Sequence, residues 1–317
     1  MREGWQDVAA LPRSSIKEGT MTMDPAALQS TSASTVYRPV EAEGVGIFLR
    51  EAGPQDAPTV VLLHGFPSSS RMFDQLIPLL ATQYHVVAPD LPGFGQSDRP
   101  APDKFDYSFD KLSEVVSSLL ARLGLDRWHL FMQDYGGPVG FRVMERNRAS
   151  VRSMIVQNAS AYLQGLGPKW KGIARYWADP ERHPEIYESF ASLEGAKQRH
   201  VAGSPRPERY NPDTWIDEFA TLSRPGVHEI QARLLRDYRT NVEAYPRWQR
   251  WLRENRPPAL IVWGRYDPSF IEAGALAYQS DLPDAEIHLL DAGHFALDEK
   301  LDEVARLMID FLDRVPA

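Results

Sequence analysis

Six short apolar runs, most of them separated by helical stretches, constrain the fold of this chain more than any other feature. Short continuous apolar runs are typical of strands buried in parallel sheets. Strands that alternate with helices predict right-handed βαβ units in a sheet covered on both faces. The expected strands are Thr59–Leu63, His85–Ala88, Trp128–Met132, Val151–Val156, Ala259–Val262 and Glu286–Leu290, and the expected helices are Arg71–Thr82, Phe109–Leu123, Val139–Arg146, Ile271–Ser280 and Glu299–Phe311.

Two further segments complete the predicted architecture. Tyr37–Ala42 and Gly46–Arg50 alternate in polarity around a Glu-Gly turn, which predicts an antiparallel hairpin at the start of the sheet. The strand pattern stops between 159 and 256, where apolar residues recur at helical spacing and a helical cap is expected. We therefore predict an α/β fold: a mostly parallel, doubly wound, eight-stranded sheet with a helical cap inserted after strand 6. The predicted domains are a flexible arm (1–34), a core (35–158 and 257–317) and the cap (159–256).

Composition excludes several classes of function. The net charge of −8 comes from interspersed acidic and basic residues, so no nucleic-acid or membrane partner is expected. The chain has no cysteine, which excludes disulfides and thiol nucleophiles. Neither a signal-like apolar run nor a membrane-spanning stretch is present, and we expect a cytoplasmic protein. No metal-ligand cluster, phosphate-binding glycine loop or dinucleotide fingerprint is recognisable, and we expect no cofactor.

Chemically useful groups follow four of the expected strands. Ligands bind at the carboxyl ends of the strands in an open parallel sheet, so these positions belong to one site. His64-Gly-Phe-Pro67 is a tight turn that can offer a backbone N–H to a developing negative charge. Asp134-Tyr-Gly-Gly137 has the strand, turn and helix context of a nucleophile elbow. Asp267 and His294 follow the last two strands.

The motifs HGFP, PDLPGFGQSD, QDYGG, WGRYDP and DAGHF, in this order, resemble the α/β-hydrolase superfamily from about residue 37 to the C-terminus. The resemblance implies a triad of Asp134, His294 and Asp267. Asp267 is the better orienting acid, because the superfamily's other position for that acid holds Asn158 here. A helix N-cap is the alternative role for Asp134, and the two other filled triad positions argue against it.

Aspartate at the elbow, where the superfamily usually has serine, predicts the reaction class. A carboxylate is already ionised near neutral pH and can displace a leaving group from a tetrahedral carbon directly. The product is an alkyl ester on Asp134, which a water activated by His294 and Asp267 then hydrolyses. Backbone N–H groups of Phe66 and Tyr135 are the expected oxyanion hole. This chemistry resembles epoxide hydrolases and haloalkane dehalogenases more than esterases.

Epoxide hydrolysis to a vicinal diol is the favoured reaction. HGFP is common among epoxide hydrolases, whereas haloalkane dehalogenases typically have Asn or Glu in place of Phe66 and Trp in place of Tyr135. Epoxide hydrolases also use two cap tyrosines as acids. Tyr238, in a Tyr-Arg dipeptide, matches one of these two acids. Tyr176 and Tyr187 lie at suitable positions for the second acid, and Tyr176 is preferred.

Further expectations concern the pocket and the alternatives. The substrate is expected to be a small apolar electrophile that reacts with water, and the protein a monomer or homodimer. The alternative enzyme is a haloalkane or haloacid dehalogenase, and a non-catalytic ligand-binding protein is the alternative of another class. We assign His64, Pro67, Trp263 and Phe295 to the substrate pocket.

Overall fold

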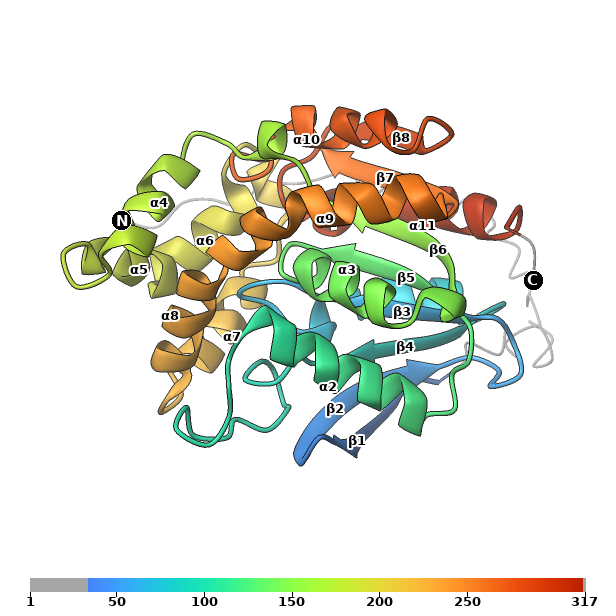
Figure 1. The fold of residues 1–317 in the computed structure, drawn as a ribbon, viewed down its shortest axis with the longest axis horizontal. Helices are drawn as coiled ribbons and strands as arrows, with labels where there is room; N and C mark the ends of the chain where they lie inside the picture. Colours follow the sequence, from blue (N-terminus) through green and yellow to red (C-terminus); the bar gives the residue numbers. More distant parts are fainter. Residues whose placement is uncertain (1–33, 316–317) are drawn as a thin grey trace, which may run out of the picture. The chain divides into compact units, whose positions relative to one another are not determined.

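One eight-stranded sheet organises the computed structural model, which describes residues 34–315. Its strand order is β1-β2-β4-β3-β5-β6-β7-β8, and every pair from β4 to β8 is parallel. Strands β1 and β2 form the predicted antiparallel hairpin, and β2 pairs antiparallel with β4. The predicted fold class is therefore confirmed (Figure 1). The strands are β1 Val36–Ala42, β2 Val45–Ala52, β3 Thr59–Leu63, β4 His85–Pro89, β5 Trp128–Gln133, β6 Val151–Gln157, β7 Ala259–Gly264 and β8 Glu286–Leu290.

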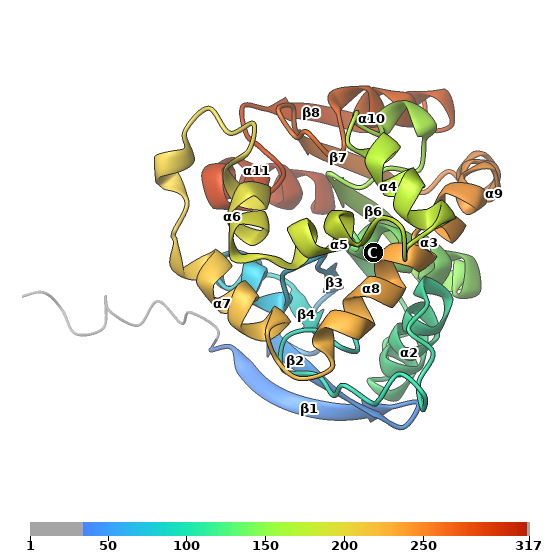
Figure 2. The same cartoon turned by 90° about the vertical axis from the view of Figure 1, so that its left-hand side faces the viewer.

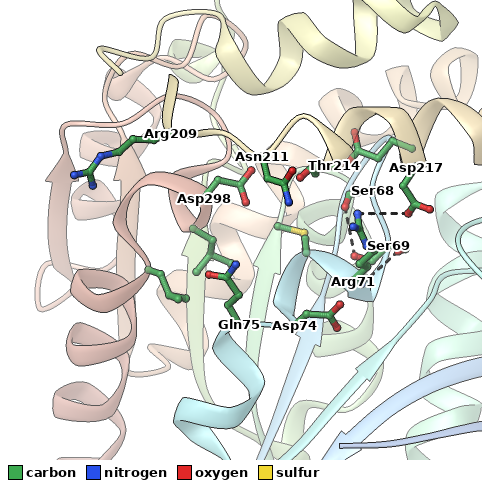
Figure 3. Close-up of a pocket in the computed structure, with 14 residues that line it drawn as sticks. Ser68, Ser69, Arg71, Asp74, Gln75, Arg209, Asn211, Thr214, Asp217 and Asp298 are labelled. Carbon is green, nitrogen blue, oxygen red and sulfur yellow. Dashed lines mark hydrogen bonds and ion pairs between the residues drawn. The ribbon is translucent and has the colours of Figure 1, made fainter. Parts of the chain in front are cut away.

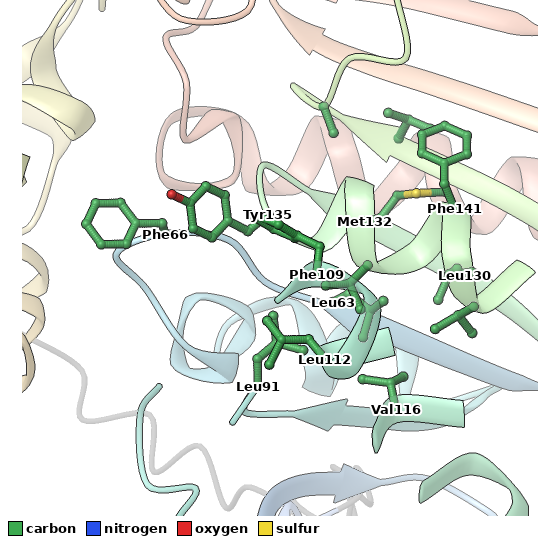
Figure 4. Close-up of a cluster of buried hydrophobic side chains, with 14 of the residues drawn as sticks. Leu63, Phe66, Leu91, Phe109, Leu112, Val116, Leu130, Met132, Tyr135 and Phe141 are labelled. Atoms are coloured by element: carbon green, nitrogen blue, oxygen red, sulfur yellow. The ribbon is translucent and has the colours of Figure 1, made fainter. Parts of the chain in front are cut away.

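Helices cover both faces of the sheet. Helices α2 and α3 pack together on one face, where α10 contacts β7 and β8, and α1 packs with α11 on the other face. Side chains of a strand alternate between the two faces, so Val61 and Leu63 of β3 enter one core while Val60 and Leu62 enter the other. Figure 4 shows part of the first core around Leu63. The helices are α1 Leu76–Leu80, α2 Phe109–Arg122, α3 Gly136–Arg146, α10 Glu272–Ala277 and α11 Ala296–Leu312.

The helix predicted over Arg71–Thr82 is broken in two. A 3-10 turn occupies Ser70–Phe73, and α1 begins only at Leu76. Pro78 explains the late start, because proline has no N–H to donate and is tolerated only in the first turn of a helix. The predicted helix Ile271–Ser280 similarly ends in a 3-10 turn, Tyr278–Ser280.

Six α-helices follow β6. The structure describes all of residues 159–256, and no strand lies among them. The parallel strands β5, β6 and β7 point toward α4–α8 in Figure 1, and Figure 2 shows α5–α8 in front of the sheet. We call α4–α9 the cap helices; their division from the core as a separate domain remains a prediction. Residues 1–33 of the predicted arm lie outside the described residues. The cap helices are α4 Trp170–Ala178, α5 Pro184–Ala191, α6 Leu193–Val201, α7 Asp213–Leu222, α8 Val227–Asp237 and α9 Arg239–Asn255.

A buried histidine joins the cap helices to the core. His200 on α6 contacts Glu218 of α7 through Nε2 at 2.9 Å and Asp298 of α11 through Nδ1 at 3.0 Å. Its ring also stacks on Phe295, with ring centres 4.0 Å apart. Burial alone would lower the pKa of His200, but the two carboxylates outweigh burial and raise it to about 9.

We expect this contact to make stability depend on alkaline pH. The pKa of His200 is higher in the folded protein than in the unfolded chain, so its contribution is fully present below the ordinary value of 6.5 and is lost as pH rises through about 9. Urea unfolding of the wild type and of His200→Gln at about pH 6 and about pH 10 measures the contribution of His200 to the free energy of unfolding. The difference between the two proteins should shrink by up to ~3 kcal/mol at the higher pH. A difference that does not change with pH would contradict the assigned charge.

Candidate active site

Asp134 lies at the sharp turn between β5 and α3. Its φ is +49°, a left-handed conformation that is uncommon for residues other than glycine and is often found at functional sites. The turn packs tightly against the neighbouring strand, since a Cβ on Gly136 would lie 2.3 Å from the carbonyl oxygen of Leu63. The local sequence thus fixes the carboxylate at the carboxyl end of β5, as expected for an elbow.

The Asp134 carboxylate uses its two oxygens differently. Oδ1 accepts hydrogen bonds from the backbone N–H of Phe66 and of Tyr135, both at 2.7 Å. These are the two donors that the sequence analysis proposes for an oxyanion hole. Oδ2 instead faces the imidazole of His294, with 3.6 Å between Oδ2 and Nε2. One oxygen is therefore held by fixed dipoles while the other is directed toward the histidine.

His294 lies between two carboxylates. Its Nδ1 is 2.6 Å from Oδ2 of Asp267, on the side away from Asp134. A proton on Nδ1 donated to Asp267 leaves the Nε2 lone pair facing Asp134, which is the tautomer that a general base requires. The side-chain amide nitrogen of Gln133 lies 2.9 Å from the same Nε2. A water that approached Asp134 would replace this amide donor at Nε2, and the imidazole would then be oriented to accept its proton.

Asp267 is almost completely buried, with 2% of its surface exposed. Burial raises its pKa, but the charge of His294 and the hydrogen bond to it, aided by the charge of Lys169 and the backbone N–H of Ser269, lower the pKa below its usual value. Asn158, at the end of β6, donates from Nδ2 to Oδ2 of Asp267 at 3.0 Å. Asp267 is therefore held in place from two directions.

A small cavity opens above Asp134 and His294. It offers about 20 Å³ to a water-sized molecule, roughly the space that one water needs. Most of its wall is apolar or aromatic, and two cap residues, Lys169 and Arg199, add positive charge. The wall consists of Phe66, Asp134, Tyr135, Lys169, Trp170, Ile173, Phe190, Arg199, Leu235, Ser269, Phe270 and His294.

The four residues assigned to the substrate pocket from sequence do not line this cavity. His64 is fully buried and accepts the N–H of Leu91 at Nε2, at 3.0 Å. Trp263 donates to the carbonyl of Phe270, and Phe295 stacks on His200. These side chains support the turns around the site, and Pro67 likewise lies outside the wall.

The two cap tyrosines lie near the cavity but are not part of its wall. Tyr238 is fully buried, with its ring 5.7 Å from that of Tyr135 and 4.6 Å from that of Trp170, and both of these rings line the cavity. Its hydroxyl neighbours that of Tyr245, but no hydrogen bond of good geometry satisfies it. The Tyr176 hydroxyl donates to the carbonyl of Ala232 at 3.4 Å.

Lys169 and Arg199 are the charged wall residues that sequence reasoning misses. Both belong to the cap, where no motif precedes or follows them, and only the packing of α4 and α6 over the sheet brings them to Asp134. A second cavity of about 200 Å³ lies at the boundary between α7 and α11 (Figure 3). Its wall includes Arg71, Asp217 and Asp298 but no member of the predicted triad.

The described residues contain neither a metal-binding cluster nor a membrane-spanning helix. Within 34–315, no three His, Asp or Glu side chains are grouped so that they could hold a metal ion. In the same part of the chain, every helix is too short or too polar to cross a bilayer.

Comparisons with known proteins agree with this fold. A family model described as the alpha/beta hydrolase fold matches residues 58–301. An uncharacterised hydrolase of Saccharomyces cerevisiae is 38% identical over 84% of this chain and 93% of its own length. A haloalkane dehalogenase of Psychrobacter cryohalolentis is 27% identical over 84% of this chain and 87% of its own. The solved structure of the epoxide hydrolase CorEH superposes with a TM-score of 0.74 at 20% identity, covering 89% of this chain and all of that one. This chain therefore belongs to the α/β-hydrolase family.

Proposed function

We propose that this hydrolase acts at saturated carbon through an alkyl ester on Asp134. The observation that carries the proposal is that the two oxygens of this carboxylate have different contacts. Oδ1 is held by two backbone N–H groups, while Oδ2 faces the cavity side of His294. A serine at this position would have to lose a proton before attack, whereas a carboxylate oxygen forms a bond to carbon directly.

The first step forms one bond and breaks one. Oδ2 of Asp134 attacks the substrate carbon, and the bond from that carbon to the departing atom breaks, with its electron pair leaving on that atom. In an epoxide the departing oxygen remains attached through the second ring carbon and takes up a proton. In a halide the departing atom leaves as an anion.

The second step uses His294. Nε2 removes a proton from water while the water oxygen attacks Cγ of Asp134, and the negative charge develops on Oδ1. The N–H groups of Phe66 and Tyr135 already contact that oxygen, so they stabilise the charge without rearrangement. The bond from Cγ to the alkyl oxygen then breaks, and the alcohol oxygen takes the proton held by His294. The new Asp134 carboxyl group releases the second proton of the water, to solvent after halide departure or to the deprotonated acid after epoxide opening, and the carboxylate is regenerated.

An epoxide is the substrate class that we propose first. The supporting observation is the Tyr238 hydroxyl, which is buried without a satisfactory partner. The ring of Tyr238 packs against those of Tyr135 and Trp170 in the cavity wall. A buried hydroxyl of this kind needs an explanation, and a substrate oxygen would provide one. Rotation of the ring toward the cavity would let it protonate the opened epoxide.

Halide release is the second candidate. Lys169 and Arg199 place positively charged N–H donors in the cavity wall. Such donors stabilise a departing halide without transferring a proton. The sequence relationship to a haloalkane dehalogenase supports the same candidate.

Trapping the ester tests the proposal and separates the two candidates. In His294→Gln the second step should stop, so incubation with propylene oxide or 1-bromopropane should leave an alkyl group on the peptide that contains Asp134, detected by mass spectrometry. His294→Gln combined with Asp134→Ala is the matched control. An adduct from the epoxide alone supports the first candidate, and an adduct from the bromide alone supports the second. If neither probe marks Asp134, simple epoxides and alkyl bromides are excluded as substrates, and a ligand-binding role gains ground.

A further inference from the structure

Two cap cations share the cavity with the Asp134 carboxylate. Lys169 precedes α4, and Arg199 lies in the last turn of α6. The guanidinium group of Arg199 contacts two stacked phenyl rings, with its Cζ 4.6 Å from the centre of the Phe66 ring and 4.2 Å from that of Phe190. Cation–π contact with both rings favours this position of the charge. The two rings therefore hold the cation in the wall of the cavity.

Arg199 does not use all of its hydrogen-bonding capacity. Its Nη2 donates to the carbonyl oxygen of Phe190 at 2.7 Å. Its Nη1 is shielded from solvent and has no hydrogen-bond partner. A guanidinium N–H that is both buried and unsatisfied carries an energetic cost, which a bound acceptor would remove.

The wall of the cavity contains more cations than carboxylates. Throughout the described part of the chain, no carboxylate lies within ion-pair distance of Lys169 or Arg199. Asp134 is the one acidic residue in the cavity wall, whereas the wall contains two cations. Burial lowers the pKa of Lys169 to about 8, even though Asp267 and Asp134 act in the opposite direction. An additional negative charge in the cavity would neutralise this excess.

We propose that Arg199 and Lys169 form a subsite for a carboxylate that the substrate carries beside the carbon attacked by Asp134. The substrate would then be a small epoxy acid or halo acid. The inference rests on the proposed function, because it assigns a substrate class to the same site. A guanidinium binds a carboxylate through parallel N–H groups, and Arg199 has a free nitrogen for this contact.

Charge complementarity supports this assignment. A substrate carboxylate brought beside the Asp134 carboxylate would be repelled unless cations offset the repulsion, and the wall supplies two.

Matched acid and amide probes test the subsite. Bromoacetate is paired with bromoacetamide, and glycidate with glycidamide, so that each pair differs in charge at nearly constant size. The absence of cysteine from the chain removes the residue that such probes modify most readily elsewhere. The rate of alkylation of the Asp134 peptide is measured in His294→Gln, alone and combined with Arg199→Gln or Lys169→Gln. Arg250→Gln, which removes an exposed cap charge outside the cavity, is the control.

Each result has a defined meaning. We expect Arg199→Gln to slow alkylation by at least one of the acids about tenfold or more while leaving both amides within about twofold, and Lys169→Gln to do the same more weakly. Arg250→Gln should change none of the rates. Equal slowing of acids and amides would make Arg199 a support of the cap and overturn the subsite. Alkylation of Asp134 that is insensitive to both substitutions would also overturn it, yet would leave the ester mechanism intact. No alkylation by any of the probes would instead count against the proposed function.

Discussion

Replacing Asp134 with asparagine is expected to lower kcat by at least about 10⁴-fold, a loss typical of a removed nucleophile. The change is nearly isosteric. Asparagine tolerates the left-handed backbone at this turn, and its amide oxygen can still accept the N–H groups of Phe66 and Tyr135. The fold should therefore survive while the oxygen that attacks carbon is replaced by a poorly nucleophilic nitrogen. Steady-state turnover of the substrate identified by ester trapping measures the loss.

Two controls make this result interpretable. Asp291→Asn removes an acidic side chain that is 62% exposed and contacts Arg265 and the hydroxyl of Tyr266, both outside the cavity wall, so it should leave turnover unchanged. Intact mass must be followed in Asp134→Asn, because His294 could direct water at the new amide and restore the aspartate. Full activity in a sample whose mass still shows asparagine would contradict Asp134 as the nucleophile.

The sheet could be predicted from sequence because its strands are encoded locally. Runs such as Thr59–Leu63 and Glu286–Leu290 are short and bounded by turn residues, and the structure reproduces both without a shift. The relative placement of Asp134, Asp267 and His294 follows from the same pattern. All three come directly after parallel strands, and such strands end at a common edge of the sheet.

The cavity wall could not be predicted in the same way. Lys169 and Arg199 reach Asp134 through the packing of cap helices. Neither the spacing of these two residues nor their neighbours in sequence indicate that they lie near Asp134. The Tyr-Arg dipeptide likewise identifies Tyr238, which lies at a helix end, but not the direction of its hydroxyl group. His64 and Trp263 are adjacent in sequence to site turns, yet both make hydrogen bonds inside the core instead of lining the cavity. Adjacency along the chain is a weak guide to which way a side chain points.

Asp267→Asn is expected to impair the second chemical step far more than the first. Asparagine offers His294 either a weaker acceptor or an N–H donor, and the latter favours the tautomer that cannot act as a base. We expect kcat to fall about 10³-fold to 10⁴-fold, as for other triads that lose the orienting acid. Alkylation of Asp134 should stay within about tenfold of the wild type, since attack by the carboxylate needs no base. Rapid-quench mass spectrometry should therefore find the ester accumulated on most of the enzyme.

The neighbouring amide allows a sharper version of this experiment. Asn158 comes from the end of β6, and its Nδ2 lies 3.0 Å from the Asp267 oxygen that contacts His294. Adding Asn158→Asp to Asp267→Asn moves the acid to an adjacent strand end without changing the net charge. Part of the lost rate, about tenfold or more, should return if orientation of His294 is what Asp267 provides. Recovery will be incomplete, because the new carboxylate cannot donate to the carbonyl of Gly264 as Asn158 does at 3.1 Å. Ester that accumulates in the single variant but clears in the double variant would identify the histidine as the base for hydrolysis. If a folded double variant remains as slow as the single one, a carboxylate at the end of β6 cannot replace Asp267. His294 would then require an acid that follows β7.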